Sequence, residues 1–182
     1  MVNRIVVAFI VVLVAGVRAD ASLVVTRFDP PSQTVVLGTN FTVNIVADID
    51  MPVVGWGLDF VPLPPGIVSL TSTPAIGTDW LSAFAPDGDG LAGLASPLPP
   101  TNGSVSGTGI VLATLSFSAD AIGATSLVAS ITPGDQTEGF ALDPTGFATV
   151  TFQPGQVTVV PEPSTTAFLL IAGVLALHRR KR

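Results

Sequence analysis

Asp87 and Asp89 are separated by one glycine and followed by Gly90, within the stretch FAPDGDGLAGLASPLPP. Alternating carboxylates on a flexible backbone supply the hard oxygen ligands that Ca²⁺ prefers. The stretch lacks a third oxygen ligand and a closing Glu, and Asp-Gly is also a strong turn signal. Two interpretations stay open, a calcium site on Asp87 and Asp89 or a polar turn at one end of the fold. We predict no other cofactor.

The two tryptophans are the side chains best suited to stack on a sugar ring. Trp56 alternates with Val54, Leu58 and Phe60, so we expect it to lie in the core. Trp80 lies in a loop-like stretch, GTDWLSAFAP. We expect Trp80 either to stack on a sugar or to plug the end of the fold.

Most catalytic chemistry is excluded by what residues 22–160 lack. The segment has no His, Cys, Lys or Tyr, since the only His is His178 and the only Lys is Lys181. This removes Ser-His-Asp and Cys-His catalysis, His- or Cys-ligated zinc and Schiff-base chemistry. Paired carboxylates for glycoside hydrolysis remain, but the spacing assigns no pair, and Asp135 and Glu138 are a weaker candidate group than the Asp87 stretch. We predict that the protein is not an enzyme.

The charge of the same segment is strongly negative. Residues 22–160 carry one cation, Arg27, and eleven acidic residues, a formal charge of −10. Such a surface repels phosphate backbones, so we expect no nucleic-acid partner. The acidic field favours divalent cations, although it also serves simply to keep an exported domain soluble.

The N-terminus has the pattern of a secretory signal peptide. Arg4 precedes an apolar run of 13 residues, 5–17, and Ala19-Asp20-Ala21 provides the small residues of a cleavage site. We predict a signal peptide over residues 1–21, cleaved after Ala21. An uncleaved membrane anchor is the alternative, although 13 residues are few for a membrane span.

The C-terminus combines a proline motif, an apolar run and a basic tail. The apolar run, residues 167–177, has 11 residues. As a helix it extends about 16 Å, against a hydrocarbon core of about 30 Å. The basic end is expected to stay cytoplasmic as a stop signal. That tail consists of Arg179, Arg180, Lys181 and Arg182 after His178.

This three-part arrangement, VPEPSTTAFLLIAGVLALHRRKR over residues 160–182, resembles a PEP-CTERM sorting signal. The resemblance implies recognition of Pro161, Glu162 and Pro163 by an exosortase-type transpeptidase. It also implies a transient tether to the inner membrane, followed by delivery to the cell surface or the extracellular space. Prolines hold the motif extended, which suits binding as a strand. An ordinary tail anchor with a proline-rich stalk is the alternative.

Between these ends the chain alternates apolar and polar residues in short runs broken by Gly, Pro, Asn and Asp. This pattern predicts an all-β sandwich of about nine strands over residues 22–160, without a helix. The predicted strands are SLVVTRF, QTVVL, FTVNIVADI, VVGWGLDFV, GIVSLT, GIVLATLSFSA, ATSLVASIT, GFATVTF and QVTVV.

The order of these runs resembles the cohesin domain, a jelly-roll sandwich of the carbohydrate-binding-like group. VVTRFDPPSQTVVLGTNFTVNIVADI opens the match, GWGLDF and LPPGIVSL follow, and GTGIVLATLSFSA, IGATSLVAS and GQVTVV close it. Cohesins bind dockerin modules through one sheet face, but no binding motif of theirs is recognisable here residue by residue. The predicted organisation is a signal peptide (1–21), a cohesin-like domain (22–160) and a sorting signal with a short transmembrane helix (161–182).

Three functions are compatible with this organisation. We expect foremost a non-enzymatic interaction module at the cell surface or in the extracellular matrix, with another surface protein as partner. The alternative is a carbohydrate-binding module acting on extracellular polysaccharide through Trp80. A hydrolase with two carboxylates is the third.

Overall fold

The structure is a computed structural model that describes residues 22–83 and 90–162. This part of the chain forms twelve β-strands and no helix, which confirms the predicted all-β sandwich. The strands are β1 (Leu23–Asp29), β2 (Ser32–Val36), β3 (Asn40–Leu63), β4 (Val68–Leu70), β5 (Ala75–Ile76), β6 (Trp80–Ala83), β7 (Gly90–Ala95), β8 (Val105–Ala119), β9 (Gly123–Ser130), β10 (Gly139–Leu142), β11 (Thr149–Phe152) and β12 (Gly155–Val160).

The long strand β3 belongs to both layers of the sandwich. Its first half pairs with β1 and β8, and its second half pairs with β7, β9 and β10. The ladder with β8 shifts register between Ile45 and Val46 and twice more before Val53. Bulges of this kind let a strand bend from one sheet into the next.

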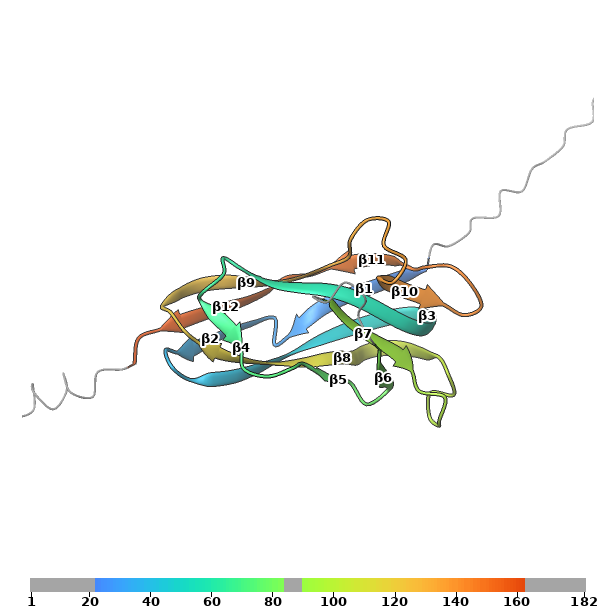
Figure 1. Ribbon diagram of the computed structural model, residues 1–182, viewed down its shortest axis with the longest axis horizontal. Coiled ribbons are helices and arrows are strands. Elements are labelled where there is room, and N and C mark those ends of the chain that lie inside the picture. Colours follow the sequence, from blue (N-terminus) through green and yellow to red (C-terminus); the bar gives the residue numbers. More distant parts are fainter. Residues whose placement is uncertain (1–21, 84–89, 163–182) are drawn as a thin grey trace, which may run out of the picture.

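One layer therefore runs β11-β1-β3-β8, with β4 and β5 side by side with β8 at its edge. The other layer runs β6-β7-β3-β9-β12-β2, with β10 beside β3 next to β9. The pairs β1–β11 and β12–β2 are parallel, and the remaining pairs are antiparallel. Figure 1 shows the resulting elongated sandwich.

Aromatic side chains connect the two layers. Phe60, from the second half of β3, lies 6.1 Å from Phe28 of β1 and 5.8 Å from Phe117 of β8, measured between ring centroids. Phe28 and Phe117 are almost completely buried. All buried apolar residues of the described part lie between Val24 and Val159. This part of the chain therefore has a hydrophobic core of its own, as an independently folding domain requires.

The strands differ from the prediction in two respects. The runs FTVNIVADI and VVGWGLDFV, predicted as two strands, are the two halves of β3. Four short strands, β5, β6, β7 and β10, were not predicted. In particular, the stretch FAPDGDGLAGLASPLPP, in which no strand was predicted, contains strand β7, residues Gly90–Ala95.

The two ends of the domain lie far apart. In Figure 1, β1 begins at one end of the long axis and β12 finishes at the other. Within residues 22–83 and 90–162, no helix is long and apolar enough to span a membrane.

Candidate functional site

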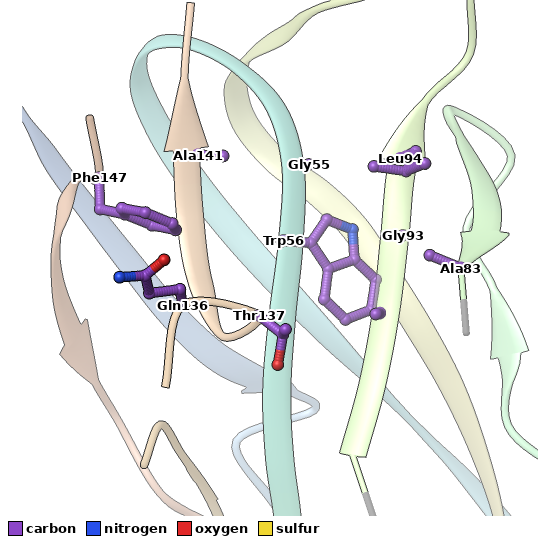
Figure 2. A pocket seen from close by; sticks show the side chains of 11 residues that line it. Gly55, Trp56, Ala83, Gly93, Leu94, Gln136, Thr137, Ala141 and Phe147 are labelled. Carbon is purple, nitrogen blue, oxygen red and sulfur yellow. The ribbon is translucent and has the colours of Figure 1, made fainter. Parts of the chain in front are cut away.

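A shallow apolar hollow of about 250 Å³ lies over the second layer, where β3, β7 and β10 run side by side. Gly55 and Gly139 line the hollow with backbone atoms alone, because neither residue carries a side chain. Figure 2 shows Leu94 and Ala83 on one side of the hollow and Phe147 on the other. We call this feature the glycine hollow.

The rims of the glycine hollow are exposed apolar side chains. Leu94 of β7 is 56% exposed, and its cross-strand partner Leu81 of β6 is 52% exposed. On the opposite side Phe147 is 53% exposed. Large apolar side chains grouped on one face, unlike singly scattered ones, mark sites where another molecule binds.

Glycines at alternate positions of β3 set the depth of the hollow. A Cβ atom on Gly55 would lie 3.0 Å from Cδ2 of Leu94, whereas one on Gly57 would lie only 2.2 Å from the carbonyl oxygen of Thr137. The loop between β9 and β10 therefore crosses directly over Gly57. Only glycine permits so close a backbone approach.

Two carboxylates hold this loop against the sheet. The Thr132 hydroxyl donates to Oδ2 of Asp59 at 3.1 Å, and the Thr132 backbone N–H donates to Oε2 of the buried Glu138. The sequence did not assign Asp59 and Glu138 as a pair, yet the fold brings both to Thr132. Both acids thereby fix the loop that carries Gln136 and Thr137 to the hollow.

Asp135 stiffens the same loop. Its Oδ1 accepts hydrogen bonds from the hydroxyl of Thr137 at 2.6 Å and from the backbone N–H of Thr137 at 2.8 Å. These bonds, the hydroxyl's first, lower the pKa of Asp135 below its ordinary value. The wall of the hollow is thus a turn locked by its own side chains, an Asx-type arrangement.

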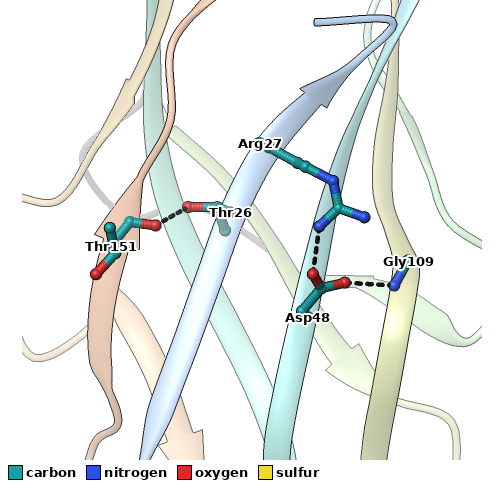
Figure 3. A network of polar contacts seen from close by, with 5 residues as sticks. All are labelled: Thr26, Arg27, Asp48, Gly109 and Thr151. Atoms are coloured by element: carbon teal, nitrogen blue, oxygen red, sulfur yellow. Dashed lines mark hydrogen bonds and ion pairs between the residues drawn. The ribbon is translucent and has the colours of Figure 1, made fainter.

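A polar network lies on the other layer, across β1, β3 and β8 (Figure 3). Nη1 of Arg27 donates to Oδ2 of Asp48 at 2.6 Å, and the Gly109 backbone N–H donates to Oδ1 at 2.7 Å. The hydrogen bond from Arg27 and then that from Gly109 lower the pKa of Asp48. Arg27 is the one Lys or Arg of residues 22–160, and this ion pair with Asp48 engages it.

The structure corrects the proposed role of Trp80. Trp80 is only 4% exposed, its Nε1–H donates to the carbonyl of Val111 at 3.2 Å, and its ring lies edge-on to Trp56 at 6.2 Å. A ring in this position offers no free face to a sugar. Trp80 instead belongs to the buried core cluster, and Trp56 lies in the core as predicted. The β6–β7 pairing, which the sequence did not reveal, explains why Trp80 is buried.

Several predicted residues lie outside the described residues. They are Asp87, Asp89, Pro163, Arg179, Arg180, Lys181 and Arg182. Pro161 and Glu162 are described, and both are exposed directly after β12. Among the residues that the structure describes, no three His, Cys, Asp or Glu side chains gather closely enough to hold a metal ion. The calcium site therefore stays a prediction.

The glycine hollow was not predicted from the sequence. One rim comes from WLSA and GLAGLA, in which small residues weaken the alternation of apolar and polar side chains. The other rim is Phe147, which precedes β11 and does not belong to a strand. The leucines of GLAGLA are three residues apart, so the segment lacks the period of two that would have indicated a strand with one exposed apolar face.

Known cohesin structures share this fold. A non-cellulosomal cohesin from the archaeon Archaeoglobus fulgidus superposes with a TM-score of 0.55 at 15% identity, covering 81% of this chain and 97% of that chain. The third ScaB cohesin of R. flavefaciens, solved in complex with a group 1 dockerin, gives 0.55 at 11% identity, covering 78% and 97%. The cohesin module of a family 33 glycoside hydrolase from Clostridium perfringens gives 0.54 at 11% identity, covering 78% and 98%.

These likenesses establish a cohesin-like jelly-roll sandwich, in agreement with the resemblance in the sequence. No protein-family model matches the chain, and a search of curated proteins also gave no match.

Proposed function

We propose that residues 22–160 form a non-enzymatic interaction module that binds a protein partner through the glycine hollow. The observation that carries the proposal is the exposure of Leu81 and Leu94 beside a hollow walled by Phe147. An apolar side chain of a partner would fill such a hollow as an anchor, surrounded by near-neutral contacts that exclude water. The complex of the R. flavefaciens cohesin with a dockerin supports a protein partner for this fold.

The charge of the module defines the partner further. With eleven acids and a single Arg in residues 22–160, and that Arg paired with Asp48, the field around the module attracts cations. A complementary surface would present Lys or Arg around an apolar anchor. We therefore expect the partner to be a basic protein surface.

The experiment compares two substitutions of equal exposure. Leu94 and Ile122 are each 56% exposed, but Leu94 lines the hollow whereas Ile122 lies in the turn between β8 and β9. Residues 22–162 are immobilised, bound material is identified from a surface extract, and affinity for the purified partner is measured by calorimetry. Leu94→Asp should weaken binding by roughly 30-fold or more, and Ile122→Asp by less than threefold. Equal affinities for the two variants would refute the hollow as the binding site.

A carbohydrate ligand is the second candidate function, now at a different residue. Phe147 is 53% exposed and lines the hollow together with the amide of Gln136, a combination of ring face and hydrogen-bonding group that suits a sugar. The test compares how much wild-type protein and how much Phe147→Ala are retained on polysaccharide from the source organism. Loss of retention would favour the sugar, and unchanged retention would remove this site.

We further propose that the module is exported and sorted through its two ends. Pro161 and Glu162 leave the fold exposed at the end of β12, which supports access by an exosortase-type transpeptidase to the Pro161-Glu162-Pro163 motif. The apolar run and the basic residues Arg179 to Arg182 would hold the chain briefly in the inner membrane before its release to the surface or the extracellular space. Replacement of all three motif residues by Ala should leave the unprocessed form in the membrane fraction. Normal processing of that variant would contradict the sorting proposal.

A further inference from the structure

Ser22, the residue that follows the predicted signal-peptide cleavage site, is hydrogen-bonded to two strands. The carbonyl of Ser22 accepts a hydrogen bond from the Thr149 N–H of β11 at 2.8 Å. The Leu23 N–H donates to both carboxylate oxygens of Asp50, at 3.0 and 2.9 Å, and the Ser22 hydroxyl donates to Asp50 Oδ1 at 3.3 Å. Asp50, near the middle of β3, thus binds both Ser22 and Leu23 through its carboxylate.

Cleavage after Ala21 would turn the Ser22 nitrogen from a neutral amide into an ammonium group. This nitrogen is bonded to the Cα of Ser22. The same Cα carries the side chain with the hydroxyl and is linked through the carbonyl carbon to the nitrogen of Leu23. Because the Ser22 hydroxyl and the Leu23 N–H already contact Asp50, the ammonium would be held close to the carboxylate, and rotation about the Cα–C bond of Ser22 adjusts its approach. A free ammonium has three donors, whereas the uncleaved amide has one.

The charges around this position favour a cation. Asp50 contacts Ser22 and Leu23, and Asp48 and Asp50 line a second hollow of about 240 Å³ together with Leu23 of β1. Asp48 is neutralised by Arg27 of β1, so Asp50 remains as a net negative charge. Neither β8 nor β11, the other strands packed here, has a titratable side chain.

We propose that Asp50 is the binding site of the chain's own new N-terminus, the ammonium of Ser22 freed by removal of the signal peptide. The inference rests on the proposed export, because it requires cleavage between Ala21 and Ser22. Removal of the signal peptide would therefore stabilise the folded domain, because the Asp50 carboxylate gains a charged partner only in the processed chain. Cleavage at another bond displaces the ammonium from Ser22 and weakens the contact.

The composition of the domain makes this site easy to test. Residues 22–162 contain no His, Cys, Lys or Tyr, so the α-amine is the only group whose ordinary pKa lies between 6 and 10. Residues 22–162, which hold the entire described core, are released from a carrier directly before Ser22 and labelled with ¹⁵N. The α-amine is then titrated by NMR, and melting temperatures are recorded from pH 6 to pH 10.

The expected result is a pKa of the Ser22 α-amine at least half a unit above its ordinary value of about 7.7–8.0, which returns to that value in Asp50→Asn. A raised pKa contributes stability that is present below the unfolded pKa and is lost as the pH rises through the folded pKa. The melting temperature of the wild type should therefore exceed that of Asp50→Asn by about 2–4 °C more at pH 6 than at pH 10. Acetylation of the N-terminus should abolish this pH dependence.

An α-amine that titrates at its ordinary pKa in both proteins would overturn the proposal, as would a pH dependence that survives acetylation. N-terminal sequencing of the exported protein tests the export premise separately. A start at Ser22 supports the proposal in the cell, and a start elsewhere overturns its cellular role even where the purified Ser22 form shows the raised pKa. Neither result bears on binding at the glycine hollow, which Leu94→Asp tests independently.

Discussion

Replacement of Gly57 by Ala tests how the loop between β9 and β10 is held over the candidate site. The new Cβ would lie 2.2 Å from the carbonyl oxygen of Thr137 and 3.1 Å from Cα of Glu138. Both atoms are backbone, so no side-chain rotation relieves the contact. To reach the 3.4 Å of ordinary contact, the Thr137 carbonyl has to move by more than about 1 Å.

The magnitude follows from three contributions. Over-packing of this kind costs about 1–3 kcal/mol, and displacement of the loop weakens the hydrogen bond between Thr132 and Glu138 by about 1 kcal/mol. Ala lowers the entropy of the unfolded chain, which offsets about 0.5–1 kcal/mol. We expect Gly57→Ala to reduce the free energy of unfolding by about 2–3 kcal/mol, equivalent to about 10 °C in melting temperature for a domain of this length.

Gly55→Ala is the matched control for this experiment. Gly55 lies two residues earlier on the same strand and faces the same side, but its new Cβ would meet chiefly the flexible end of exposed Leu94, at 3.0 Å. The free energy of unfolding should therefore change by less than about 1 kcal/mol. Thermal and urea denaturation followed by circular dichroism measure both variants. Equal stability of the two would refute the inference that the loop backbone rests on Gly57.

Three further outcomes are expected. Asp48→Asn should destabilise the domain by about 0.5–1 kcal/mol at neutral pH. Because the folded pKa of Asp48 is lowered, this difference should disappear as the pH falls through that pKa, below the ordinary 3.8, which urea denaturation across pH would show. Gly93→Ala would place a Cβ 2.7 Å from Nε1 of Trp56, so we expect a loss of about 1–3 kcal/mol and an altered near-ultraviolet tryptophan spectrum. If Asp87 and Asp89 bind calcium, a chelator should lower the melting temperature, and an unchanged value would count against that site.

The sequence was informative wherever one face of a strand is buried and the other is not. Val43 and Ile45 alternate with Thr42 and Asn44 in β3, and the structure buries both apolar side chains. The same alternation identified β8 and β9, so the sandwich was predictable from the period of two alone. The joining of two predicted strands into β3 was not, because Met51-Pro52 resembles a break and the bulges that carry the strand through it leave no local signature.

The candidate site was hidden for a related reason. In GLAGLA each face of the strand carries one leucine among glycine and alanine, Leu91 toward the core and Leu94 outward, so the apolar contrast between the faces nearly vanishes. The position of Trp80 depends on the pairing of β6 with β7, which places Trp80 opposite Ala95 and which no property of the segment GTDWLSAFAP specifies. Similarly, the isolated β-bridge between Phe147 and Ala141 brings Phe147 to the hollow. Such sites arise from the tertiary arrangement of weakly patterned segments, which composition does not encode.

The arrangement of the two ends links the proposed functions to one another. The domain leaves β12 at one end of its long axis, while β6, β7 and β10, which carry the glycine hollow, lie toward the other end (Figure 1). A chain tethered by its C-terminus would therefore present the hollow away from the membrane. The formal charge of −10 on residues 22–160 acts in the same direction, because anionic lipid headgroups repel an acidic domain. β1 begins at the end remote from β12, so the proposed contact between Ser22 and Asp50 would form at the end of the domain away from such a tether (Figure 1).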